Sequence, residues 1–242
     1  MQEPHFIKYR RSLLIAILAF TAIPALMFGQ ANSPQLTSVL NQMDTASKGF
    51  KNARADFHCD YYERVVRDTT TQVGPIYFLR EGGATQMGLV VTGPQGKPEK
   101  VVQYKDGILQ MFDPGVDQIT VLHAGANQAQ YEGYFTLGFG GSGSDLAHAW
   151  NIADLGSETL NDGSQQVKTE KLDLTSKDPS SKTFTHITIW VDPTRALSLR
   201  QIFYLANNDK RTCDYSNVKL NGKLDMKAFE IKKDSNTTVV NH

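Results

Sequence analysis

The chain has 242 residues, of which 40% are hydrophobic and 21% charged, and this is enough for one sizeable domain or two small ones. Its 25 Lys and Arg residues balance 25 Asp and Glu residues, so the sequence lacks the excess positive charge that binds nucleic acid or anionic lipid surfaces. We expect no nucleic-acid partner.

The N-terminus has the layout of a secretory signal peptide. Basic residues at positions 8–11 precede an apolar run over Leu13–Phe28. The small residues Gly29 and Ala31 follow, as they do before a cleavage site. The apolar run is shorter than the roughly 20 residues of a spanning helix, and Pro24 interrupts it, so a membrane anchor is the poorer interpretation.

We therefore predict that residues 1–31 are a cleaved signal peptide and that residues 32–242 form a single domain in a bacterial periplasm. No Cys lies near the cleavage site, so we do not expect lipid attachment there. The two cysteines, Cys59 and Cys213, favour a disulfide in such an oxidising compartment. Two free buried thiols are the alternative. Neither Cys has the spacing of a metal-ligand pair, and we predict no metal site.

The mature chain is predicted to begin with one amphipathic helix and to continue mainly as strands. Ser33 and Pro34 are typical N-cap and first helical residues, and apolar residues then recur at helical spacing as far as about 52. About ten strands at short intervals, mostly without helices between them, indicate one large antiparallel sheet. The predicted strands are 55–61, 74–80, 85–92, 99–104, 108–113, 116–122, 165–174, 183–191, 197–204 and 210–219, and the predicted short helices are 128–137 and 144–150.

Both faces of the strand at 183–191 carry apolar residues. Because successive side chains point to opposite faces, both faces of the sheet are expected to be covered. A curved sheet wrapped around a helix and an apolar hollow would explain this pattern, and so would a β-sandwich.

The segment from Lys105 to Leu122 resembles a known family. A turn at Asp106-Gly107 leads to an aromatic strand that ends at Asp113-Pro114, and a strand beginning Asp117-Gln118 follows. This order is similar to that of the periplasmic outer-membrane lipoprotein carrier family (LolA-like). The upstream strand that ends at Arg80 and the closing segment from Leu224 extend the resemblance over about 34–242.

The resemblance implies an α+β fold, an incomplete β-barrel with helices packed across its open, concave side. It further implies an apolar cavity for the acyl chains of lipoproteins or other lipids, an inner-membrane donor, an outer-membrane acceptor, no cofactor and a monomer. In that family the Arg that ends the second strand bonds to the lid backbone, which makes Arg80 the expected latch. A surface ion pair of Arg80 with Glu63 or Glu81 is the alternative. Glu81 also replaces the family's Pro, so a general carrier of hydrophobic ligands is favoured over a dedicated lipoprotein carrier.

Aromatic and methionine side chains are the candidates for lining such a cavity, although any one of them can instead fill an ordinary core. The predicted lining residues are Tyr77, Phe78, Met87, Met111, Phe112, Phe135, Trp150, Phe184, Trp190 and Phe203.

No motif argues for an enzyme. Gly138, Gly140 and Gly143 match a dinucleotide pattern but lack its βαβ unit, so we interpret this loop as a hinge or lid connection. Ser142 fails the G-x-S-x-G pattern, because position 144 is not Gly. The histidines lack metal-ligand spacing, and carboxylate pairs such as Asp60 and Glu63 fit solvated strand faces better than acid–base catalysis.

The sequence thus predicts a non-enzymatic periplasmic carrier of acyl chains, with the helices near 34–52 and 128–150 opening and closing over the cavity. An envelope sensor or regulatory module of the same fold is the alternative, although such proteins usually carry a further C-terminal domain. An exported hydrolase is the third hypothesis.

Overall fold

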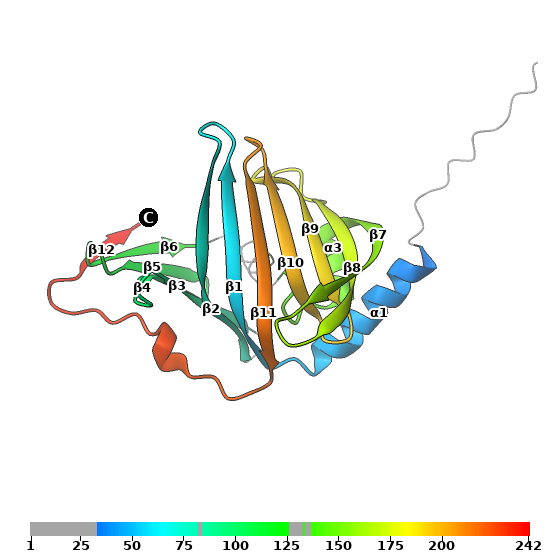
Figure 1. Cartoon of the computed structure of the whole chain (residues 1–242), viewed down its shortest axis with the longest axis horizontal. Helices are drawn as coiled ribbons and strands as arrows, with labels where there is room; N and C mark the ends of the chain where they lie inside the picture. Colours follow the sequence, from blue (N-terminus) through cyan, green and yellow to red (C-terminus); the bar gives the residue numbers. More distant parts are fainter. Residues whose placement is uncertain (1–32, 82–83, 126–132, 134–136) are drawn as a thin grey trace, which may run out of the picture. The chain divides into compact units, whose positions relative to one another are not determined.

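A twelve-stranded sheet is the framework of the protein (Figure 1). The computed structural model describes residues 33–81, 84–125, 133 and 137–242. In space the strands follow the order β12-β6-β5-β4-β3-β2-β1-β11-β10-β9-β8-β7, so β12 and β7 are the two edges and the sheet does not close. The strand bounds are β1 Asn52–Glu63, β2 Asp68–Glu81, β3 Ala84–Thr92, β4 Pro98–Lys105, β5 Ile108–Asp113, β6 Gln118–His123, β7 Trp150–Asn161, β8 Gln166–Ser176, β9 Phe184–Asp192, β10 Leu197–Leu205, β11 Lys210–Leu220 and β12 Thr238–Asn241.

The predicted antiparallel sheet is confirmed, with one parallel pair added. The pairs from β6 through to β7 are antiparallel, and β12 pairs with β6 in parallel. The chain reaches that edge after β11 through the 3-10 helix η2 (Met226–Phe229), which contacts β3 and β4. The last strand therefore arrives by a crossover and not by a hairpin, which is why its direction differs.

The first helix, α1, covers Pro34–Lys48 and begins as predicted. The Ser33 hydroxyl accepts a hydrogen bond from the Leu36 N–H at 3.0 Å, which caps the helix. The helix ends before residue 52, because the chain turns at Gly49 and the next residues enter β1. Figure 1 shows α1, in blue, beside α3 (Gly143–Ala149) and the strands β7, β8 and β9.

The buried stripe of α1 defines the inner face of the sheet, the face on which the helix packs. Four helical residues in this stripe join a core cluster with hydrophobic residues of β8, β9 and β10 and with Leu146 of α3. The stripe consists of Leu36, Val39, Leu40 and Met43. The spacing that predicts the helix thus also predicts which of its residues are buried.

Strand β7 is missing from the predicted strands. It runs over Trp150–Asn161, where most residues are exposed and hydrophobic alternation is weak. Its pairing with β8 shifts between Asp154 and Ser157, and Gly156 in between has φ +89°. An edge strand with a bulge and one solvated face carries little period-two signal. No described helix has the length and apolar composition needed to span a membrane.

Candidate functional site

A cavity of about 460 Å³ opens in the inner face, with walls from β1 to β5 and from β9 to β11. Its lining is mainly aromatic and aliphatic, and its volume lies within the roughly 300–1,000 Å³ typical of small-molecule sites. Five of the predicted lining residues are in its wall: Phe78, Met87, Met111, Phe184 and Phe203.

Tyr77 and Phe112 are predicted to line the cavity but lie on the outer face. Each follows or precedes a residue that does line the cavity, and successive strand residues point to opposite faces. The Tyr77 ring packs edge-on against Phe229 of η2, with 4.6 Å between ring centroids, and Phe112 packs against the same outer cluster. A side chain at Gly88 would collide with the Tyr77 ring, its Cβ lying 2.2 Å from Cε1.

Trp150 and Trp190 also lie away from the cavity. Trp150, the first residue of β7, belongs to the core cluster beneath α1. Trp190 alternates with Ile189, which faces α1, so its indole lies on the outer face and donates to Glu158 Oε2 at 2.7 Å. Phe135 lies outside the described residues, as does most of the predicted helix 128–137.

Phe184 lines the cavity, although regular alternation along β9 would place its side chain on the same outer face as Trp190. The pairing of β9 with β10 is irregular between Tyr204 and Leu205, and this bulge reverses the face on which Phe184 points. Its ring lies 5.3 Å from that of Phe203, centroid to centroid.

The glycine-rich loop after residue 137 inserts an aromatic ring into the cavity wall. Phe139 is 1% exposed and stacks on Phe78, with 4.0 Å between ring centroids. Gly138 and Gly140 on either side have φ +77° and +73°, a conformation that favours glycine. A Cβ at Gly140 would lie 2.3 Å from the Phe50 ring. The glycines therefore serve the close packing of this loop.

Arg80, near the end of β2, connects this loop to α1. Its Nη1 donates to the Ser47 carbonyl oxygen at 3.1 Å, and its Nη2 donates to the Gly140 carbonyl oxygen at 2.7 Å. The guanidinium carbon lies 5.3 Å from the centroid of the Phe50 ring. Both acceptors are backbone groups of the predicted lid elements, so the geometry is that of the expected latch and not that of a surface ion pair.

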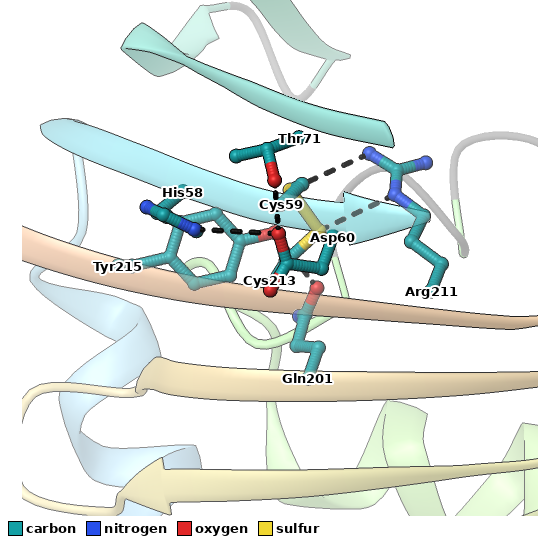
Figure 2. The surroundings of a disulfide bond; sticks show 8 residues. All are labelled: His58, Cys59, Asp60, Thr71, Gln201, Arg211, Cys213 and Tyr215. Atoms are coloured by element: carbon teal, nitrogen blue, oxygen red, sulfur yellow. Dashed lines mark hydrogen bonds and ion pairs between the residues drawn. A yellow bond between two sulfur atoms is a disulfide. The ribbon is translucent and has the colours of Figure 1, made fainter. Parts of the chain in front are cut away.

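A disulfide joins Cys59 and Cys213 across β1 and β11 (Figure 2). Both residues are buried in the core cluster that borders the cavity. The two positions are directly opposite in the β1–β11 register, which fits the pairing expected from two cysteines in an exported chain.

Polar groups reach the cavity wall from several strands, among them Gln201 of β10 and Tyr215 and Arg211 of β11. The Tyr215 hydroxyl donates to Gln201 Oε1 at 3.0 Å (Figure 2). Gln201 Nε2 in turn donates to the Leu137 carbonyl oxygen. Burial raises the pKa of Tyr215 to about 12, with the Arg211 charge acting in the opposite direction. Burial likewise raises the pKa of Tyr61, and Arg211 opposes it. Both phenols are therefore neutral at physiological pH.

Sequence reasoning did not identify Arg211, Tyr61 and Phe139 as wall residues. A signal for the first two was present, because Tyr61 and Arg211 each stand two residues from a Cys of the predicted disulfide. Period-two alternation places all four side chains on one face. Phe139 had no such signal, since it lies in a loop.

Ser142 and Asp60, two of the residues considered for catalysis, make hydrogen bonds of a structural kind. The Ser142 hydroxyl caps α3 by accepting from the Asp145 N–H at 3.0 Å. Asp60 accepts from Thr71 at 2.6 Å and lies 3.4 Å from His58 Nε2, on an exposed strand face. Within the part of the chain that the structure describes, no group of three His, Cys, Asp or Glu side chains is placed to hold a metal ion.

No protein-family model and no curated protein matches the sequence. Solved structures do match the fold. MucB superposes with a TM-score of 0.53 at 14% identity, over 86% of this chain and 66% of its own. The present chain thus spans slightly less than two thirds of MucB. An uncharacterized conserved protein from Thermus thermophilus superposes with a TM-score of 0.51 at 10% identity, over 86% of this chain and 99% of its own.

The fold is shared with these two structures. Its open sheet with helices on the inner face is the architecture expected from the sequence resemblance. A LolA superfamily protein from Nitrosomonas europaea also matches, with a TM-score of 0.38 at 16% identity over 81% of this chain and 97% of its own. Identities this low concern the fold alone.

Proposed function

We propose that the protein is a periplasmic, non-enzymatic binding protein that carries acyl chains. The observation that supports this most is the cavity, an apolar space of about 460 Å³ in the inner face of an otherwise packed sheet. Burying an acyl chain there would gain about 0.8 kcal/mol for each methylene removed from water.

Opening of the cavity would begin at Arg80 in this proposal. The guanidinium binds carbonyl groups of both α1 and the glycine-rich loop, so releasing it frees the two elements together. Phe139 would then leave its stack on Phe78 and widen the space. Cargo would pass on when an acceptor binds the chain more tightly or stabilises the open form.

The proposed cargo is the acyl part of lipoproteins or of other lipids, taken up at the inner membrane and passed towards the outer membrane. The periplasmic location rests on the predicted signal peptide, residues 1–31, which lie outside the described residues. A general acyl carrier fits the departures from the family pattern around Glu81 better than a carrier restricted to lipoproteins does.

A regulatory module of the envelope is the second candidate. MucB, which shares the fold, is also known in complex with MucA(peri). A carrier releases its lipid to an acceptor membrane, whereas a regulatory module changes its affinity for a protein when it binds lipid. Transfer of a fluorescent lipid between vesicles would separate the two, because only the carrier accelerates it.

Native mass spectrometry with lipid extraction tests the proposal on protein purified from its own periplasm. We expect a co-purified acyl lipid in near-stoichiometric amount. Leu109→Trp, which fills the cavity, should abolish it, and Leu155→Trp at an exposed site on β7 should not. A lipid-free protein that also fails to take up a fluorescent fatty acid would contradict acyl binding.

A further inference from the structure

The cavity wall contains two cations, Arg211 and Lys100, and no carboxylate among the described residues that line it. Arg211 is on β11 and Lys100 on β4, with β3, β2 and β1 between them in the sheet. The two positive charges therefore approach the cavity from different walls.

Arg211 has no oxygen acceptor within the described part of the chain. Its Nε lies 3.3 Å from Cys213 Sγ and its Nη2 lies 4.0 Å from Cys59 Sγ, as the dashed lines in Figure 2 mark. Its guanidinium carbon lies 4.8 Å from the Tyr61 ring centroid and 5.7 Å from that of Phe203. Sulfur atoms and ring faces are weak partners for a group with five N–H donors.

Other arginines in partly buried positions have oxygen partners. Arg195 Nε lies 2.6 Å from Asp192, Arg200 Nε lies 2.6 Å from Asp214, and Arg80 donates to two carbonyl groups. Arg211 differs from these three, because its charge lines a mainly apolar cavity in which the described residues supply no counter-ion. Such a charge is costly to bury, and an anion bound beside it would offset that cost through charge-assisted hydrogen bonds.

Lys100 supports the same arrangement from the other wall. None of the hydrogen bonds or ion pairs among the described residues involves its ammonium group. It also borders a second, more open pocket that contains Glu99 and Asp113, so its charge is shared between the two sites. Arg211 is therefore the main candidate and Lys100 the secondary one.

We propose that the cavity binds a single-chain amphiphile with an anionic head group, a carboxylate or a phosphate, whose head pairs with Arg211 and Lys100. This inference rests on the proposed acyl-binding function and specifies its ligand class. The tail would lie along the apolar wall formed by Phe78, Met87 and Met111. The cavity volume of about 460 Å³ is within the roughly 300–1,000 Å³ typical of sites for one small ligand.

Calorimetric titration of the delipidated protein with twelve-carbon ligands tests the head-group preference. Laurate, dodecyl phosphate, dodecanol and dodecyltrimethylammonium share one tail and differ in the head. We expect the affinity for each anion to be at least about ten times the affinity for dodecanol, and the cation to bind most weakly. The ratio between laurate and dodecyl phosphate shows whether a fatty acid or a phospholipid-type head is preferred.

Variants assign the effect to the two cations. Arg211→Gln should lower the ratio of laurate affinity to dodecanol affinity about tenfold or more, and measurable dodecanol binding by the variant would report an intact cavity. Arg211→Lys should keep part of the laurate affinity, and Lys100→Gln should have a smaller effect. The matched control is Arg54→Gln, which removes a surface cation paired with Asp56 and should change neither affinity.

Equal affinities for laurate and dodecanol in the unmodified protein would overturn the head-group inference while leaving acyl binding in place. Unchanged laurate binding by a folded Arg211→Gln would overturn it as well. If Arg211→Gln does not fold, the laurate-to-dodecanol ratio and Lys100→Gln decide the question. Failure of all four ligands to bind would instead contradict the proposed function itself.

Discussion

The inner face of the sheet has a filled half and a hollow half. In the filled half, β8, β9 and β10 lie beneath α1, and Leu172, Leu174, Ile187 and Ile189 are all 0% exposed. In the hollow half, β1 to β5 and β11 surround the cavity together with a few residues of β9 and β10, and wall residues such as Leu89 are only partly buried. A sheet needs a second layer over its apolar face. A helix is that layer on one side, and we propose that a ligand completes it on the other.

The two halves also differ in how they are held together. The filled half relies on close aliphatic packing, whereas the hollow half contains the disulfide between β1 and β11 and the hydrogen bonds of Arg80 to α1 and the glycine-rich loop. The difference suggests that covalent and polar links stabilise a region whose packing is incomplete. Four predictions test this contrast between the halves.

Removing the disulfide should have the largest effect. The two cysteines are 154 positions apart, so their disulfide closes a long loop in the unfolded chain. The Cys59→Ala/Cys213→Ala double variant removes this restriction, and we expect the free energy of unfolding to fall by about 4 kcal/mol. Urea unfolding measures this. Reduction of the unmodified protein should produce a similar loss. A change below about 1 kcal/mol would mean that the hollow half does not depend on its disulfide.

Leucine truncation compares the two halves directly. Leu174→Ala should lower the free energy of unfolding by about 3 kcal/mol, because it leaves a void in a packed core. Leu89→Ala, on the cavity wall, should cost about 1 kcal/mol, because the residue already borders empty space. Urea unfolding of both variants measures the difference. Equal losses would show that the two halves are packed alike.

Loss of the latch should loosen α1 and the glycine-rich loop together. Arg80→Met removes two charge-assisted hydrogen bonds, so we expect a loss of about 2 kcal/mol and faster amide exchange at both elements. Arg80→Lys should recover part of the effect, and Arg54→Met at the surface should have none. Unchanged amide exchange and unchanged lipid release in Arg80→Met would show that Arg80 does not act as a latch.

Acid should weaken a turn of the filled half. Burial alone would raise the pKa of Asp162, but hydrogen bonds from Ser164 and Gln165 and the charge of Arg195 lower it to about 2. Because the folded pKa is below the usual 3.8, this stabilisation is complete above about pH 4 and is lost as the pH falls towards 2. We expect the free energy of unfolding to fall by on the order of 2 kcal/mol when Asp162 is protonated.

Asp162→Asn is the matched variant for that pH dependence. Its stability near pH 7 should be lower than that of the unmodified protein, and its curve between pH 4 and pH 2 should be flatter. Chemical denaturation across this range measures both. Parallel curves for the two proteins would show that another carboxylate controls the acid sensitivity.

The sequence predicted the framework of the fold because period and capping are local signals. The stripe beginning at Leu36 predicted α1, and alternation predicted most strands to within a few residues. Alternation did not predict β7, because an exposed edge strand needs few apolar residues.

The cavity residues were harder to predict. Phe78 and Met111 line the cavity, whereas the adjacent Tyr77 and Phe112 cannot, since neighbours in a strand face opposite sides. Applying alternation from the two cysteines would have selected Arg211. Phe139 depends on the path of a loop, which no residue pattern specified.

Photo-cross-linking tests the hollow-half account most directly. A fatty acid with a diazirine near the end of its chain would be bound, irradiated and mapped by peptide mass spectrometry. We expect labels on cavity-wall residues such as Met87 and Met111, with none on Leu174 or Ile187 of the filled half. Labels beneath α1, or labels spread over the outer face, would contradict it.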